Sequence, residues 1–242
     1  MTLSSLVVTP SHSLYEQSWA PSDMRGGGSV NADGFGIGWY PEGDAAVSGG
    51  PVRYRRDVPI WTDENLAGLA GAIRSGAVLA AVRNGTVGMP YGQSAVAPFA
   101  SGHWLFSHNG RITGWPGATV KLAESLPVGD LLNLDAPTDS VFLWALIVRR
   151  LGDGVPPADA VAAVVRDVET AAPGSRLNLL LTDGEQLIGT TWTHSLHVRR
   201  TRDSMTVASE PFGDGEWQAV PDRSLLVATA TSLQVTPMEG HL

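Results

Sequence analysis

The first regular pattern along the chain is an alternation of glycine with large apolar residues. Residues 34–39 read GFGIGW, and a period of two is that of a β-strand whose glycine face lets another backbone or a ligand approach closely. The run AVLAAVR at 77–83 is short, apolar and bounded by glycine, which predicts a buried strand. Residues 103–108 predict a further strand, and the Asn109-Gly110 pair after it is typical of a tight turn.

Helical spacing is clearest in the middle of the chain. Residues 139–151 carry a broad apolar face, end on two arginines and are followed by glycine, which predicts a helix. Residues 157–171 have the same character. Weaker signals favour a helix from Thr62 to about Arg74 and helical structure within 117–133.

After Gly174 the pattern changes to short strands separated by Asp-Gly and similar turns. The predicted strands are 176–181, 186–192, 196–200, 205–209 and 225–229. Strands, central helices and a strand meander predict an α+β protein of stacked sheet and helix layers, with residues 1–242 as a single domain.

Composition narrows the possible functions. With 43% hydrophobic and 17% charged residues, the chain can bury a sizeable core, and its net charge of −8 argues against a nucleic-acid surface. The absence of cysteine excludes, within these residues, disulfides, thiolate-bound metals and a cysteine nucleophile. No apolar run approaches the length of a membrane span, so we expect a soluble cytoplasmic protein. Nothing in the sequence predicts its oligomeric state.

Motifs for cofactors and metals are absent from the sequence. The glycine run at 26–28 predicts a loop, but it is followed by Ser29-Val30 and not by the lysine of a phosphate-binding loop. His194 and His197 lie in a region of strand and turn, where they would not share a helical face. We therefore expect neither a metal nor a cofactor.

Three places combine polar groups with the ends of predicted elements. Arg83 closes an apolar strand and needs an acidic partner or a ligand carboxylate. The Asn109 amide and the Gly110 N–H suit either an ordinary turn or an oxyanion hole. Asp139 lies in the first turn of a predicted helix, where a carboxylate is stabilised by the free N–H groups, so helix capping is the alternative to ligand binding.

Several segments, taken in order, resemble the class II glutamine amidotransferase family of N-terminal-nucleophile hydrolases. The similarity is greatest to the branch of γ-glutamyl amidohydrolases in ergothioneine biosynthesis, which act on γ-glutamyl-hercynylcysteine sulfoxide. The segments that carry it are NADGFGIGW (31–39), AVRNGTVGMP (81–90), WLFSHNG (104–110) and TDS (138–140), with EQSWAP (16–21), APF (97–99), SRLNLLLTDG (175–184), ASEPF (208–212) and VPDR (220–223).

The resemblance implies a four-layer αββα sandwich and a mechanism in which an N-terminal cysteine attacks the γ-carbonyl of a glutamyl amide. It also implies that Asn109 and Gly110 hold the oxyanion, that Arg83 grips the glutamyl α-carboxylate and that Asp139 binds the α-ammonium. Asn84-Gly85 replaces a small Ser-Ala pair of the branch, which bears on the leaving-group side of the pocket.

The start of the chain departs from the family. Relatives open with Met-Cys-Arg-His, whereas this chain opens with MTLSSLVV, which resembles a segment about ten residues further on. We expect the first strand and its cysteine to lie upstream of Met1, and the chain as written to be inactive by the family mechanism. The alternatives are a non-catalytic binder of γ-glutamyl ligands, a glutaminase-type amidotransferase with another substrate, and a hydrolase that uses Thr2.

Overall fold

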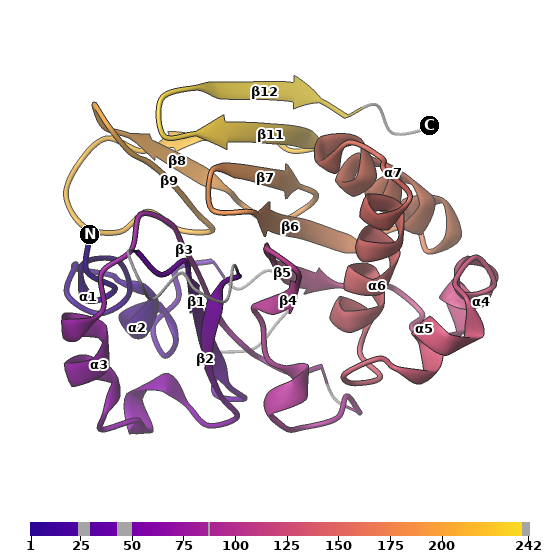
Figure 1. Ribbon diagram of the computed structural model, residues 1–242, viewed down its shortest axis with the longest axis horizontal. Helices are drawn as coiled ribbons and strands as arrows, with labels where there is room; N and C mark the ends of the chain where they lie inside the picture. Colours follow the sequence, from indigo (N-terminus) through magenta and orange to yellow (C-terminus); the bar gives the residue numbers. More distant parts are fainter. Residues whose placement is uncertain (24–29, 43–49, 87, 239–242) are drawn as a thin grey trace.

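The computed structural model describes residues 1–23, 30–42, 50–86 and 88–238, and the predicted loop at 26–28 lies outside them. Within these residues the chain forms four layers, two of helix enclosing two of sheet, as Figure 1 shows. The fold is therefore the α+β sandwich that the resemblance implied. Each helical layer packs on its sheet through the apolar side chains of its helices.

The first sheet forms around the glycine-rich strand. β1 (Phe35–Trp39) pairs antiparallel with β2 (Val52–Arg56) on one side and with β3 (Val78–Val82) on the other. A Cβ atom added to Gly36 would lie 2.1 Å from the carbonyl oxygen of Ala97, so only glycine allows the backbones to approach this closely. The predicted strand and the reason for its glycines are both confirmed.

Three short helices cover the outer face of this sheet. They are α1 (Ser4–Val7), α2 (Leu14–Gln17) and α3 (Leu66–Ala72). Their apolar side chains share a core with β1, formed by the buried residues Leu3, Val7, Phe35, Ile37, Ile60, Leu66 and Ala70.

The second sheet has six strands in the order β12-β11-β7-β6-β5-β4. Their bounds are β4 (Phe99–Ser101), β5 (Trp104–Arg111), β6 (Arg176–Thr182), β7 (Gln186–Thr191), β11 (Ser224–Thr229) and β12 (Leu233–Pro237). Helices α6 (Asp139–Gly152) and α7 (Pro157–Ala171) cover its outer face. Leu177, Leu179 and Leu181 of β6 pack with both helices in the largest core of the described residues.

A small third sheet contains β8 (His197–Arg200), β9 (Met205–Ala208) and β10 (Gln218–Ala219), in the order β10-β8-β9. Among the described residues, β9 pairs only with β8, and β3 pairs only with β1. Each of these two strands therefore has one edge without a neighbouring strand.

Several predicted elements differ from the structure. The helix predicted from Thr62 begins at Leu66, because Asp63 instead accepts bonds from the Asn65 N–H and the Tyr54 hydroxyl. Region 117–133 is broken into a 3₁₀ turn (Gly117–Thr119), α4 (Val120–Ala123) and α5 (Val128–Leu132), separated by a loop that ends in proline. Further 3₁₀ turns lie at Ile60–Thr62 and Gln93–Ala95. β3 is half-exposed rather than buried, apart from Leu79.

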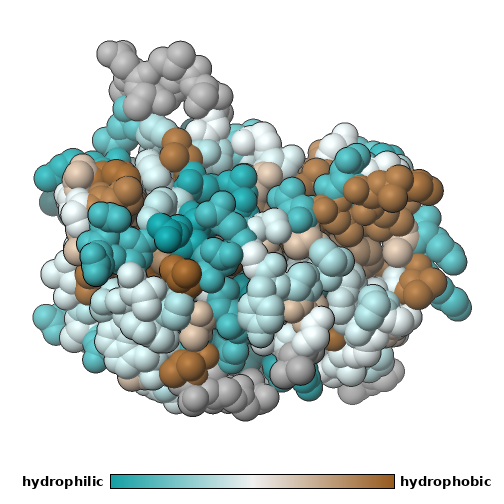
Figure 2. Space-filling view, turned by 90° about the horizontal axis from the view of Figure 1, so that it is seen from below, coloured by the Kyte–Doolittle hydropathy of each residue, from teal (hydrophilic) through white to brown (hydrophobic). Residues whose placement is uncertain are grey.

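The surface of α4 and α5 is unusually apolar. Val120, Val128 and Leu132 are exposed, and Figure 2 shows apolar side chains gathered at the end of the molecule where these helices lie.

Candidate active site

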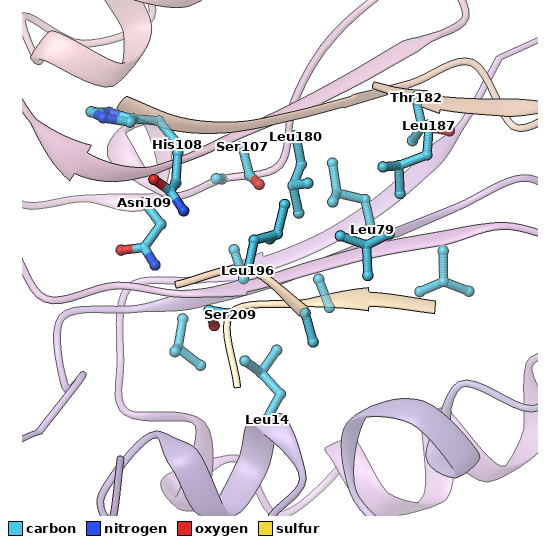
Figure 3. Close-up of a pocket in the computed structure, with 18 of the residues that line it drawn as sticks. Leu14, Leu79, Ser107, His108, Asn109, Leu180, Thr182, Leu187, Leu196 and Ser209 are labelled. Atoms are coloured by element: carbon cyan, nitrogen blue, oxygen red, sulfur yellow. The ribbon is translucent and has the colours of Figure 1, made fainter. Parts of the chain in front are cut away.

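A cavity of about 860 Å³ lies between the sheets. The half-exposed strands β3 and β9 line it together with the inner face of β5 and β6. In the close-up of Figure 3, Asn109 lies at one end of the cavity and Thr182 and Leu187 lie toward the other. The residues singled out from the sequence, Arg83, Asn109, Gly110 and Asp139, all line this cavity.

Arg83 follows directly after β3 and is held by the loop before β1. Its backbone N–H donates to Gly34, its carbonyl accepts from the Asp33 N–H, and the Asp33 carboxylate accepts from the Gly85 N–H at 2.7 Å. The guanidinium Nη2 donates to the carbonyl of Pro90 at 3.1 Å, while Nη1 is buried and has no hydrogen-bond partner among the described residues. A buried cationic donor without a partner is costly, so this geometry suits a ligand oxygen at Nη1.

Gly85 explains how the sequence accommodates this arginine. A Cβ atom at Gly85 would lie 3.0 Å from both Nη1 and Nη2 of Arg83, so an alanine here would press on the guanidinium. The Asn84-Gly85 pair therefore gives Arg83 more room than a Ser-Ala pair would.

Asn109 and Gly110 do not form the tight turn that the sequence predicted. They lie inside β5, where Asn109 is opposite Asn178 and Gly110 is opposite Leu177 of β6. Gly110 has a φ of +154°, and a Cβ atom there would lie 1.9 Å from the carbonyl oxygen of Arg176. The glycine therefore serves a close approach of two strands, and the Asn-Gly pair was misread because this approach joins residues distant in sequence.

Asp139 is buried at the start of α6 but does not cap the helix. Thr138 is the N-cap and accepts from the Val141 N–H at 3.2 Å. The Asp139 carboxylate accepts from the Ile112 N–H at 3.0 Å and from the Ser140 N–H at 2.8 Å. It has no cationic partner among the described residues. A buried carboxylate of this kind retains the capacity to accept from an ammonium group.

His108 connects the elements beneath Asn109 and Gly110. Its Nε2 lies 2.9 Å from the Arg176 carbonyl oxygen, and its Nδ1 lies 2.9 Å from the Ser140 hydroxyl. Because a carbonyl only accepts, Nε2 carries the proton and Nδ1 accepts from Ser140. Burial lowers the pKa of His108, and the nearby Asp139 carboxylate opposes that shift only in part. The ring is thus a neutral link between β5, β6 and α6.

Thr2 lies outside the cavity lining. It forms an antiparallel bridge with Arg74, and the Met1 ammonium donates to the Ser75 carbonyl at 3.0 Å. These contacts are at the end of β3 remote from Arg83.

The chain is similar to known proteins of one family. The model of class II glutamine amidotransferases matches residues 11–216. A γ-glutamyl-hercynylcysteine sulfoxide hydrolase from Mycolicibacterium smegmatis is 37% identical over 98% of this chain and 95% of its own length. A hydrolase of the same name from Mycobacterium tuberculosis is 38% identical over 99% of this chain and 93% of its own length.

The chain belongs to the class II glutamine amidotransferase family.

Solved structures agree with this assignment. A protein described as a glutamine aminotransferase class-II domain protein, from Silicibacter pomeroyi, has a TM-score of 0.67 at 26% identity, and the match covers 86% of this chain and 92% of the other. The glutamine phosphoribosylpyrophosphate amidotransferase of Bacillus subtilis has a TM-score of 0.63 at 14% identity, over 87% of this chain and 44% of its own, which shows the shared fold. The chain therefore has the sandwich fold of the N-terminal-nucleophile enzymes.

Two buried polar residues of this chain, Glu210 and Asn178, were not singled out from the sequence. The Glu210 carboxylate lies 2.6 Å from His12 Nε2 and accepts from the Ser22 N–H at 2.8 Å. Asn178 holds the chain around 192–195, accepting from the Trp192 N–H and donating to the carbonyls of His194 and Ser195. Both lie in segments quoted for the resemblance, ASEPF and SRLNLLLTDG, but only the fold reveals their partners.

The described residues contain no group of three or more His, Cys, Asp or Glu side chains placed to hold a metal. His197 contacts the Ser209 carbonyl at 3.2 Å. No helix in the described part of the chain is both long and apolar enough to cross a membrane.

Proposed function

We propose that this protein hydrolyses the γ-glutamyl amide bond of γ-glutamyl-hercynylcysteine sulfoxide and releases glutamate. The observation that carries the proposal is the buried Arg83 Nη1, which lacks a partner among the described residues and shares one cavity with the Asp139 carboxylate, for which those residues supply no cation. The names of the two mycobacterial relatives support the substrate.

The glutamyl end of the substrate supplies the groups that these side chains need. The α-carboxylate would accept from Arg83, and the α-ammonium would donate to Asp139. Two opposite charges at fixed positions select an amino acid over a simple acid or amine, because each end of the ligand must find its complement.

Bond cleavage in this proposal follows the acyl-enzyme route. A nucleophile attacks the γ-carbonyl carbon, and the Asn109 side-chain amide and the Gly110 N–H stabilise the oxyanion that forms. The α-amine of the nucleophilic residue takes the proton of the nucleophile and passes it to the amide nitrogen, which leaves as the amine when its bond to the γ-carbon breaks. Water then attacks the acyl intermediate, which releases glutamate and the free nucleophile. A neutral His108 beneath the strand would keep Asn109 and Gly110 in place.

The nucleophile in this proposal is carried by an extended segment between β3 and β9. Both strands have an edge without a partner among the described residues, and both line the cavity. An inserted strand would pair with both edges, joining the first and third sheets. The antiparallel contacts of Met1 and Thr2 with residues 74–75 set a direction that leads along β3 toward Arg83.

A binding protein for γ-glutamyl compounds is the second candidate. This candidate would use Arg83 and Asp139 but would not need the oxyanion site.

Binding to the 242-residue chain tests the recognition step without cleavage. We expect a γ-glutamyl dipeptide to bind in isothermal titration calorimetry, and Arg83→Gln to weaken it about 50-fold because a charge-assisted bond is lost. Arg149→Gln is the matched control, since Arg149 pairs with Asp153 at the end of α6 and does not line the cavity. Equal affinity of the wild type and Arg83→Gln would refute the proposed recognition.

A further inference from the structure

Two arginines face each other across the strands that carry the oxyanion site. Arg111 ends β5 and lies directly opposite Arg176, which begins β6, and both line the cavity. Within the described residues, neither side chain forms an ion pair or a hydrogen bond, and Arg176 Nε is buried without a partner. Arg111 is exposed and Arg176 is half-buried. Like charges directly opposite each other in a sheet are destabilising, and an anion bound between them would relieve that repulsion.

The electrostatics of Arg176 agree with this interpretation. Burial lowers the pKa of Arg176, and the positive charge of Arg111 lowers it further. A carboxylate between the two guanidinium groups would offset both effects, because it would supply the acceptor that Nε lacks and screen the repulsion between the charges.

The pair lies next to the oxyanion site. Along β5, Arg111 is two residues beyond Asn109 on the same face, a separation of about 7 Å in an extended strand. The Arg176 carbonyl contacts His108 Nε2 at 2.9 Å, and it is the atom that a Cβ at Gly110 would meet. An anion held by the pair would therefore lie close to the carbonyl that is attacked.

We propose that Arg111 and Arg176 together bind the carboxylate of the leaving group. When the amine of a γ-glutamyl amide is an amino acid, its own carboxylate lies one carbon away from the scissile nitrogen. The ammonia released from glutamine carries no such group. This subsite, which rests on the proposed function, selects γ-glutamyl amides of amino acids, including cysteine-derived ones, over glutamine.

A pair of ligands that differ in one charge tests the subsite. We expect the 242-residue chain to bind γ-glutamyl-alanine about tenfold more tightly than γ-glutamyl-alanine amide, since only the acid offers the second carboxylate. The double variant Arg111→Gln/Arg176→Gln should lose this preference while keeping its affinity for the amide. Arg149→Gln should retain both affinities, and the melting temperature of each variant reports its folding.

Other outcomes overturn the proposal. Equal binding of acid and amide by the wild type would show that no leaving-group carboxylate is recognised. If the double variant loses affinity for both ligands equally, the arginine pair binds the glutamyl end of the ligand or stabilises the fold.

A ligand without the glutamyl end separates this proposal from the proposed function. N-acetyl-alanine keeps the amide and the leaving-group carboxylate, but it lacks the α-carboxylate and α-ammonium that would bind Arg83 and Asp139. We expect it to bind more weakly than the dipeptide, to be preferred over N-acetyl-alanine amide and to lose that preference in the double variant. If both γ-glutamyl ligands fail to bind while N-acetyl-alanine keeps its preference, the glutamyl assignment fails and the arginine subsite stands. No preference for N-acetyl-alanine over its amide would overturn the subsite.

Discussion

Arg83 and Asp139 reach the cavity from different layers of the sandwich. Arg83 follows β3 of the first sheet, and Asp139 begins a helix on the outer face of the second. Neither has an oppositely charged partner among the described residues, and Arg83 Nη1 has no partner of any kind there. Such buried charges are normally paired, which is why a ligand with both charges is the simplest explanation.

Asp139 should discriminate between ligands by their α-ammonium. In the variant Asp139→Asn, the amide oxygen can still accept from the Ile112 N–H, whereas the bond from the Ser140 N–H to the second carboxylate oxygen is lost, so the melting temperature of the variant is measured as well. We expect affinity for a γ-glutamyl dipeptide to fall about tenfold, because a charged bond is lost. The analogue without the amine should bind both proteins equally in calorimetry. If the variant loses affinity for both ligands, Asp139 supports the fold and does not recognise the α-ammonium.

The sequence predicted the residue types of the site better than their surroundings. Arg83, at the end of a strand, and Asp139, at the start of a helix, were singled out because a charge at an element boundary is visible in one dimension. The structure places both at the cavity, and their roles in binding stay predictions. The tight turn at Asn109-Gly110 was wrong, because the glycine is required by the carbonyl of Arg176, 66 residues away by sequence number. The sequence assigned no role to Arg111 and Arg176 for the same reason, since their pairing also joins strands that are distant in sequence.

Among the elements, β1 depends on the absence of a side chain at Gly36. We expect Gly36→Ala to lower the free energy of unfolding by about 3 kcal/mol, because its Cβ would lie 2.1 Å from the Ala97 carbonyl oxygen. Gly68 in α3 is the matched control, since a Cβ there meets nothing within 4 Å. Gly68→Ala should raise the free energy of unfolding by about 0.5–1 kcal/mol. Urea unfolding measures both, and similar effects of the two substitutions would contradict the packing described.

The link formed by His108 predicts a pH dependence of stability. Its pKa is lowered in the folded protein, so the unfolded chain binds a proton more readily than the folded one. Stability from this group is therefore present above the unfolded pKa of about 6.5 and is lost as the pH falls below that value. We expect His108→Gln to flatten the decrease in urea midpoint between pH 7.5 and pH 5.5. An unchanged slope in the variant would show that other groups cause the decrease.

Elements with one strong pattern were predicted well. Helices α6 and α7 and strand β1 were found because their apolar periodicity agrees with the layer that they bury. Strand β2 was missed because VRYRR has three arginines in five residues, two of which donate to the carbonyls of Pro98 and Val96. Its strand character comes from pairing with β1, which the sequence does not display.

At the scale of the whole molecule, the first two sheets meet at a cavity that is lined by Arg83, Asp139 and the pair Asn109 and Gly110. The second sheet supplies Asn109 and Gly110, the first supplies Arg83, and helix α6 supplies Asp139. The edges of β3 and β9 line the same space. This arrangement is the one that the proposed function requires, with groups for the γ-glutamyl end and for the oxyanion in one cavity.

The most direct test is the release of glutamate from γ-glutamyl-hercynylcysteine sulfoxide. The 242-residue chain would be compared with a form that begins with cysteine and carries about ten further residues before Met1, enough to run beside β3 at about 3.3 Å per residue. We expect the cysteine form to release glutamate, Asn109→Ala in that form to reduce the rate about 100-fold, and the 242-residue chain to release none. Release by the 242-residue chain that depends on Asn109, or none by the cysteine form, would contradict the account.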